Sequence, residues 1–136
     1  MICQGQISFG AHTQLTYLGS CVSIIIFSLS RNAAGLSHVV GHVTQMGKYN
    51  LAWQVLDYYQ QVLSKFGTFE YYLIGGSDFC KHVLQETEDE LAKRRIQYTK
   101  LDVLGNYYRR VLILPKERTI KLFKKVIYQP FETGNR

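Results

Sequence analysis

The sequence lacks a hydrophobic run that could cross a bilayer. The longest apolar stretch, 22–27, contains a serine and is far shorter than the roughly 20 residues of a membrane-spanning helix. The N-terminus also lacks the basic segment, apolar core and cleavage site of a signal peptide. We therefore expect no membrane insertion and a cytoplasmic location.

Cysteine and proline are both scarce. The three cysteines, Cys3, Cys21 and Cys80, are irregularly spaced, which argues against a disulfide framework and against a CxxC zinc site. No set of three or four ligands recurs at zinc-binding spacing, so no metal site is predicted. With two prolines and 46% hydrophobic residues, the 136-residue chain has the composition of a folded protein, and its length fits one domain spanning 1–136.

Acidic residues are also few. The chain has 10 Asp and Glu against 16 Lys and Arg, a net charge of +6, which favours acidic partners or surfaces. Much of the positive charge falls in the last third of the chain, at Arg109, Arg110, Lys116, Arg118, Lys121, Lys124 and Lys125. Such residues on strands are typical of a solvated face, so we do not expect a nucleic-acid partner.

Hydrophobic patterning predicts strands at both ends of the chain and helices in the middle. The predicted strands are 6–9, 14–18, 21–29, 36–43, 68–74, 97–104, 107–114 and 119–128. A helix is predicted from Asn50, as its N-cap, to Phe66, with Gly67 as its stop. A second helix, capped by Ser77 or Asp78, is predicted to run to about Arg95. This order predicts an α/β layered sandwich of mixed, largely antiparallel sheets with two or so helices.

The stretch "LTYLGSCVSIIIFS" places a cysteine between a tight turn and a buried strand. A cysteine nucleophile needs a neighbouring base and donors for an oxyanion. Gly19 allows the backbone to turn sharply, the amides around Ser20 and Cys21 could face an oxyanion, and His38 of "GLSHVVGH" could serve as the base. The plainer alternative is that Cys21 is a buried structural residue, as free cysteines commonly are.

The register of the 21–29 and 36–43 hairpin decides which histidine faces Cys21. Residues directly opposite in an antiparallel pair have a constant index sum. A turn centred near Leu29–Ser30 sets Cys21 opposite His38, whereas a turn centred on Arg31–Asn32 favours His42. The two histidines share a strand face, so the sequence alone leaves both open.

The motif "TYLGSCVSIIIFS" followed by "AGLSHVV" resembles the signature of the CheD family, the chemoreceptor glutamine deamidases. In that family a "T-x-LGSCV" segment leads into an apolar strand, and a "G-x-x-H" segment follows; here the two motif residues are 17 positions apart. The segments "GKYNLAWQVLDYYQQVL", "YYLIGGSDF" and "DVLGNYYRRVLIL" also resemble family segments, in the same order. The likeness spans most of the chain, and the Cys and His motifs are its specific part.

The resemblance implies a layered α/β fold, related in its active site to toxins that deamidate glutamine. It also implies a triad of Cys21, His38 and Thr16, with Thr13 as an alternative third member, supported at the turn by Gly19 and Ser20. The implied reaction converts glutamines of chemoreceptor helices to glutamate through a cysteine thioester, without metal or organic cofactor. Receptor methylesterase activity and a CheC-type phosphatase partner belong to the same expectation.

Two other functions stay open at this point. The same chemistry could act on a different protein target, as in the toxin-like relatives. The fold could also serve as a non-catalytic docking module in chemotaxis signalling.

Overall fold

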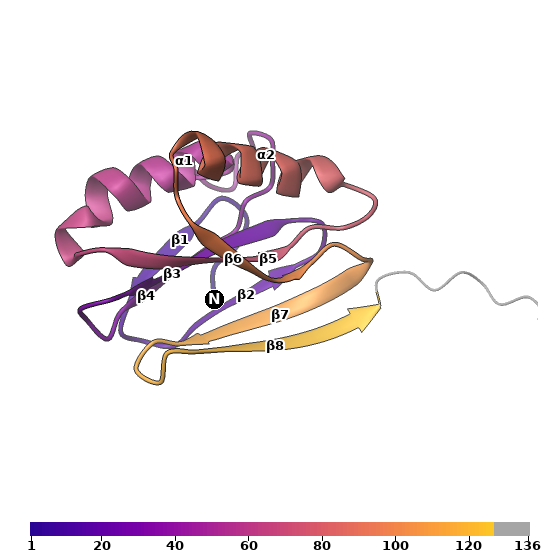
Figure 1. Cartoon of the computed structure of the whole chain (residues 1–136). Coiled ribbons are helices and arrows are strands. Elements are labelled where there is room, and N and C mark those ends of the chain that lie inside the picture. The colour runs from indigo at the N-terminus through magenta and orange to yellow at the C-terminus, as the bar shows by residue number, and fades with distance from the viewer. Residues whose placement is uncertain (127–136) are drawn as a thin grey trace, which may run out of the picture.

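The computed structural model describes residues 1–126, which form three layers (Figure 1). The first part of the chain supplies β1 (Ile7–Gly10), β2 (Gln14–Leu18), β3 (Val22–Ser28), β4 (Ala34–Ser37) and α1 (Ala52–Asp57). The second part supplies β5 (Phe69–Gly75), α2 (Lys81–Lys93), β6 (Tyr98–Val103), β7 (Tyr107–Leu114) and β8 (Thr119–Val126). The helices cover one face of a five-stranded sheet, and a three-stranded sheet lies on the other side.

The two sheets are largely antiparallel, which confirms the predicted fold class. The five-stranded sheet has the order β1-β4-β3-β5-β6, and the three-stranded sheet has the order β2-β7-β8. Only the β5–β6 pair is parallel among the described strands. That pair is joined by α2, as a parallel connection requires a crossover.

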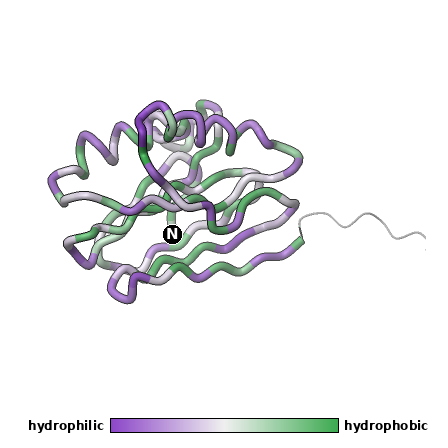
Figure 2. The backbone as a smooth tube through the Cα atoms, viewed as in Figure 1, coloured by the Kyte–Doolittle hydropathy of each residue, from purple (hydrophilic) through white to green (hydrophobic). Residues whose placement is uncertain are grey.

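Strand β3 is the centre of the fold because both of its faces are covered. Ile24 and Ile26 pack under the helices, while Ile25 and Phe27 face the three-stranded sheet, and all four are at most 3% exposed. Figure 2 shows hydrophobic residues along these inner strands and hydrophilic ones along the outer helix surfaces. The chain before β3 crosses from one sheet to the other, which carries the Cys21 turn to the junction between the two layers.

The predicted helix 50–66 forms, but not as one regular α-helix. Leu51, and not Asn50, is the N-cap; the Gln54 Oε1 atom accepts hydrogen bonds from the backbone N–H groups of both residues, at 3.0 Å. After α1 the helix continues as a π-helical turn, Tyr58–Val62, and a 3-10 turn, Leu63–Phe66. It ends at Gly67, as predicted, where φ is +101°.

Other element ends differ from the sequence prediction. The second helix begins at Lys81 with Cys80 as its N-cap, because the Ser77 hydroxyl accepts the Cys80 N–H within the preceding turn. The predicted strand 36–43 is replaced by β4, which is shorter and shifted towards the N-terminus. Positions 127 and 128 of the last predicted strand lie outside the described residues. No helix among residues 1–126 has the length and apolar character needed to span a membrane.

Candidate functional site

The Cys21 turn is held from one side by the glycine pair at the end of β5. The Gly76 N–H donates a hydrogen bond to the Cys21 carbonyl oxygen, at 2.9 Å. Gly75 has a φ of +116°, and a Cβ atom there would lie 2.3 Å from the same oxygen. A glycine is therefore required at position 75, and the GG pair lets the backbone of β5 approach the turn closely.

The β3–β4 register places Cys21 opposite neither of the two candidate histidines. Strand pairs Ile26–Gly35 and Val22–Val39 share one register, which corresponds to a turn centred between the two turns considered above. Continued outward, this register sets Cys21 level with Val40. Both expected registers were therefore wrong.

The same register still brings His38 near Cys21. The register sets His38 opposite Ser23, which lies two residues after Cys21 and on the same face of the strand. Cys21 and His38 are therefore diagonal neighbours across the strand pair. His42 is exposed beyond a bend, because Val40 and Gly41 both donate their N–H groups to the Asn50 carbonyl. Of the two histidines, the structure holds only His38 in the space between the sheets, where it is 6% exposed.

Thr16 lies against His38. The Thr16 Oγ1 atom is 2.9 Å from the His38 Nδ1 atom and 3.0 Å from the Ile2 carbonyl oxygen. Thr16 belongs to the inner face of β2 and is fully buried, whereas Thr13 is exposed. The N-terminal segment reaches this site because Ile2 forms a bridge to Thr16 and donates its N–H to the Leu15 carbonyl.

This pair of contacts fixes the tautomer of His38. A carbonyl oxygen can only accept, so the single hydroxyl proton of Thr16 goes to Ile2. The Thr16 oxygen must then accept from Nδ1–H of His38, which leaves the lone pair on Nε2. The ring can therefore accept a proton at Nε2, as a general base must.

Both candidate reactive groups are uncharged at neutral pH. Burial, with a smaller contribution from the nearby Cys80 thiol, raises the pKa of Cys21 to about 11. Burial lowers the pKa of His38 to about 4. A resting thiolate–imidazolium pair is therefore not formed, and no hydrogen bond joins Cys21 to His38 within residues 1–126. Any attack by this thiol must be accompanied by proton transfer to a base.

Two backbone amides at the turn have no acceptor among residues 1–126. Within the described part of the chain, neither the Ser20 N–H nor the Cys21 N–H donates a hydrogen bond to a protein group. The Ser20 hydroxyl is instead held by the Ser77 hydroxyl at 3.1 Å, which ties the turn to the residue after the glycine pair. Two adjacent unpaired amide donors in the turn that carries the thiol are the kind of group from which an oxyanion hole is built.

Ser23 is a buried polar residue next to the candidate site that sequence reasoning missed. It is fully buried, and its hydroxyl oxygen has no hydrogen-bond partner among residues 1–126. Ser23 lies on the same face of β3 as Ile25 and Cys21, and the register sets it opposite His38. A serine inside a run of β-branched residues was the available signal, since an apolar strand gains nothing from a buried hydroxyl.

The sequence-based prediction for Arg109 was wrong. It was expected on a solvated basic face, but its side chain is fully buried because it occupies an inward position of β7. Its guanidinium donates to the Asp102 carboxylate at 2.9 Å, to the Gly76 carbonyl at 2.9 Å and to the Leu104 carbonyl. Lys124 is exposed, as expected, and donates to the other Asp102 oxygen at 3.0 Å.

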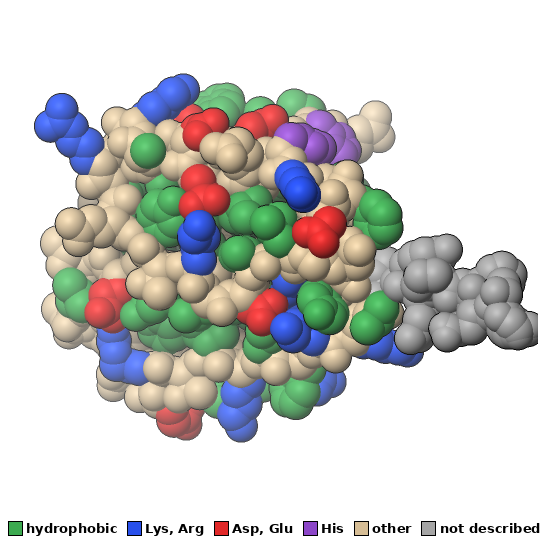
Figure 3. Space-filling model, turned by 45° about the vertical axis from the view of Figure 1, so that its right-hand side comes forward, with side chains coloured by type: hydrophobic (Ala, Val, Ile, Leu, Met, Phe, Trp, Pro, Cys, Tyr) green, Lys and Arg blue, Asp and Glu red, His purple; other side chains and the backbone are tan. Residues whose placement is uncertain are grey.

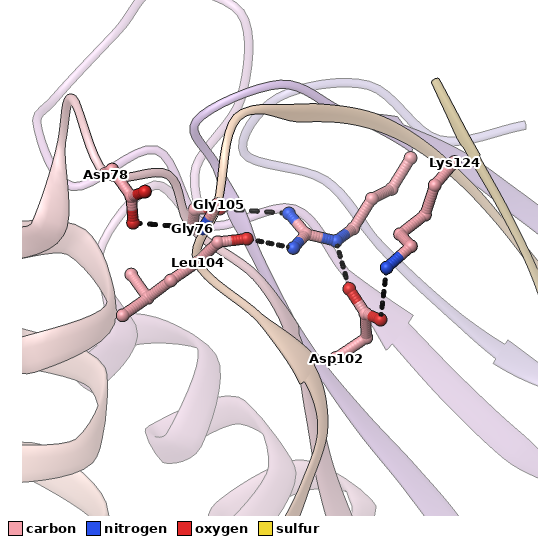
Figure 4. A network of polar contacts seen from close by, with 7 residues as sticks. Gly76, Asp78, Asp102, Leu104, Gly105 and Lys124 are labelled. Atoms are coloured by element: carbon pink, nitrogen blue, oxygen red, sulfur yellow. Dashed lines mark hydrogen bonds and ion pairs between the residues drawn. The ribbon is translucent and has the colours of Figure 1, made fainter. Parts of the chain in front are cut away.

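This cluster, which we call the arginine clasp, consists of Arg109, Asp102, Lys124, Gly76 and Leu104 (Figure 4). It joins β7 and β8 of the small sheet to β6 and to the chain after β5 in the large sheet. Because Gly76 also donates its N–H to the Cys21 carbonyl, the clasp is connected through Gly76 to the turn that carries Cys21.

Two hollows of the surface lie away from this turn. One, of about 430 Å³, is lined by residues that include Tyr59, Gly67 and Phe69, and another, of about 510 Å³, by residues that include Leu29 and Glu70. Both are at the opposite end of the β3–β5 pair from Cys21. No group of three or more His, Cys, Asp or Glu side chains in the described part of the chain is arranged to hold a metal ion.

Comparison with known proteins gives no identification of the chain. No protein-family model matches it, and no curated protein matches it with significant similarity. The candidate site is therefore judged by its own geometry.

Proposed function

We propose that this protein is a protein-glutamine deamidase whose nucleophile is Cys21. The observation that carries the proposal is the 2.9 Å contact between the Thr16 hydroxyl and Nδ1 of His38, from which we infer that Nδ1 carries the proton and Nε2 keeps its lone pair. A histidine oriented by a third group beside a cysteine is the arrangement expected of a catalytic triad. The CheD-like motifs add the substrate class, namely glutamine side chains of chemoreceptor cytoplasmic helices.

The proposed reaction has two acyl-transfer steps. The Cys21 sulfur attacks the carboxamide carbon while Nε2 of His38 takes the thiol proton, and the Ser20 and Cys21 amides receive the oxyanion. The C–N bond then breaks, and the same proton leaves on ammonia, so a thioester remains on Cys21. Water, deprotonated by His38, hydrolyses the thioester to glutamate and restores the thiol. A methyl ester would follow the same route with methanol as the leaving group.

The buried, neutral thiol favours one rival. Cys21 is only 9% exposed and packs with Leu18, Ile25 and Val40, which is the setting of a structural cysteine. In that case the protein would be a docking module that binds a signalling partner, such as a CheC-type phosphatase, without turning over a substrate.

Ammonia release separates the two functions. Wild-type protein incubated with a chemoreceptor cytoplasmic fragment should release ammonia, and Cys21→Ser should release none while it keeps the wild-type circular dichroism and partner binding. His38→Ala should also abolish release, whereas His42→Ala, the matched control on the exposed bend, should not. Absence of ammonia with the wild type, together with intact partner binding, favours the module. Loss with His42→Ala and not with His38→Ala contradicts the assignment of the base.

A further inference from the structure

The outer face of the three-stranded sheet combines exposed aromatic rings with positive charge. The cross-strand register aligns Tyr17, Arg110 and Phe123 in one row across β2, β7 and β8. Neighbouring rows pair Tyr108 with Lys125 and Leu112 with Lys121. We call this the basic aromatic face, and its members are Tyr17, Tyr108, Arg110, Lys121, Phe123 and Lys125.

The aromatic side chains of this face are unusually open to solvent. Tyr17 is 51% exposed, Tyr108 56% and Phe123 49%. The Arg110 guanidinium lies over the Phe123 ring, 4.2 Å from its centroid. Exposed tyrosine, phenylalanine and arginine gathered on one surface are the composition of a protein-binding patch.

The charge of this face has one sign. Its charged members, Arg110, Lys121 and Lys125, are all basic. Figure 3 shows several Lys and Arg side chains along the lower part of the molecule. The acidic residues of α2, Glu86, Glu88, Asp89 and Glu90, belong to the helical layer on the opposite side of the five-stranded sheet (Figure 1). The charge of the molecule is therefore polarised, and the basic aromatic face complements an acidic partner.

The basic aromatic face reaches the candidate active site. A Cβ atom on Gly19 would meet the Tyr108 ring at 3.8 Å, so this ring lies against the turn that carries Cys21. A polypeptide laid along β7 from the Arg110 row would thus pass the Tyr108 ring and arrive at the turn.

We propose that the basic aromatic face docks an acidic, partly apolar polypeptide segment of the substrate and delivers its glutamine to Cys21. This inference rests on the proposed function, because the adjoining turn is taken to act on a side-chain amide of a protein. A peptide is favoured over single-stranded nucleic acid, because the turn that this face adjoins is taken to act on the side-chain amide of a glutamine, a group that only a polypeptide supplies.

The test uses the full chain carrying Cys21→Ser, so that binding is measured without turnover. The probe is a short fluorescein-labelled peptide in which glutamates and leucines surround one glutamine, and its twin has lysines in place of the glutamates. Binding is followed by fluorescence anisotropy at low and high salt. The face variant combines Arg110→Glu, Lys121→Glu and Lys125→Glu. The matched control applies the same charge reversal to exposed Lys48, Lys65 and Arg95, which lie outside the three-stranded sheet.

The face variant should bind the acidic peptide at least roughly tenfold more weakly, while the control variant changes affinity about twofold or less and the lysine twin does not bind. Equal weakening in both variants overturns the proposal, because the effect would then follow net charge alone. Tighter binding of a labelled oligouridine than of the acidic peptide also overturns the proposal. It is likewise overturned if the protein is a homodimer that the charge reversal of the face variant dissociates and that of the control variant does not. Intact docking without ammonia release by the wild type would refute the proposed function and leave the docking face standing.

Discussion

Replacement of Arg109 by methionine should destabilise the protein far more than the same change at its neighbour on β7. The Arg109 side chain is fully buried and holds Asp102, Gly76 and Leu104. Methionine fills a similar length of space but donates no hydrogen bond. The substitution therefore removes the polar partners of the clasp with little loss of packed volume.

The expected loss follows from the groups left behind. Each buried carbonyl that loses its donor costs about 1–3 kcal/mol, and the carbonyls of Gly76 and Leu104 are both affected. Asp102 keeps its hydrogen bond from Lys124, so its own contribution is smaller. The free energy of unfolding should therefore fall by about 2–5 kcal/mol, a large part of the roughly 5–15 kcal/mol of a typical domain.

Urea unfolding at pH 7 measures this loss, with Arg110→Met as the matched control. The control removes an exposed guanidinium and should change the free energy of unfolding by less than about 1 kcal/mol. A loss below about 1 kcal/mol for Arg109→Met would refute the clasp as a stabilising element.

The difference between wild type and Arg109→Met should also depend on pH. Burial by itself raises the pKa of Asp102, but hydrogen bonds from Lys124 and Arg109 outweigh this and hold the pKa below its usual value. A carboxyl with a lowered folded-state pKa stabilises the protein above its unfolded pKa of about 4, and this stabilisation is lost as the pH falls through the folded value. The stability gap should therefore narrow below about pH 4, which urea titrations at several pH values would detect.

Three further changes test the surroundings of Cys21. Burial lowers the pKa of His38 from 6.5 to about 4, so between these pH values His38 binds a proton in the unfolded chain but not in the folded protein. The free energy of unfolding should therefore fall by about 2–3 kcal/mol between pH 7 and pH 4, and the fall should be smaller in His38→Asn. Ser23→Ala removes an unpartnered hydroxyl and should leave thermal stability unchanged or raised; a clear loss would reveal a partner. Gly75→Ala should lower the urea midpoint sharply because its Cβ meets the Cys21 oxygen, while Gly19→Ala, with the Tyr108 ring 3.8 Å away, should not.

The element order was predictable because local patterns dictate it. The alternation of buried and exposed positions in β7 and the Gly67 stop of the first helical segment are both visible in the sequence. Propensity does not encode the π-helical turn at Tyr58–Val62, since the fully buried Tyr59 is held there by a long-range hydrogen bond from its hydroxyl to the Ile24 carbonyl, at 2.7 Å. Tertiary contacts decided that detail.

The candidate site was predictable only in part. The motifs located Cys21, His38 and Thr16, but the register that sets Cys21 level with Val40 depends on how β4 ends. There the Ser37 hydroxyl replaces the backbone ladder by donating to the Ile24 carbonyl and accepting the Ile24 N–H. A side chain that takes the place of backbone ladder hydrogen bonds leaves no periodic pattern in the sequence. The register of the two strands could therefore not be predicted by counting residues from the turn.

Arg109 was misjudged for a related reason. A basic residue on a strand is normally solvated, and burial becomes favourable only when a carboxylate and backbone carbonyls converge on it. Its partners Gly76 and Asp102 come from two other segments of the chain, and only the packing of the two sheets brings them to Arg109.

The most direct test of the proposed chemistry is peptide mapping by mass spectrometry of host-cell proteins before and after incubation with this protein. We expect defined glutamines, including sites in chemoreceptor helices, to gain the mass that replacement of an amide by a carboxyl group entails. Cys21→Ser of wild-type fold should leave every one of them unchanged. A wild-type protein that converts no glutamine, or a Cys21→Ser variant that converts the same ones, would contradict the central claim.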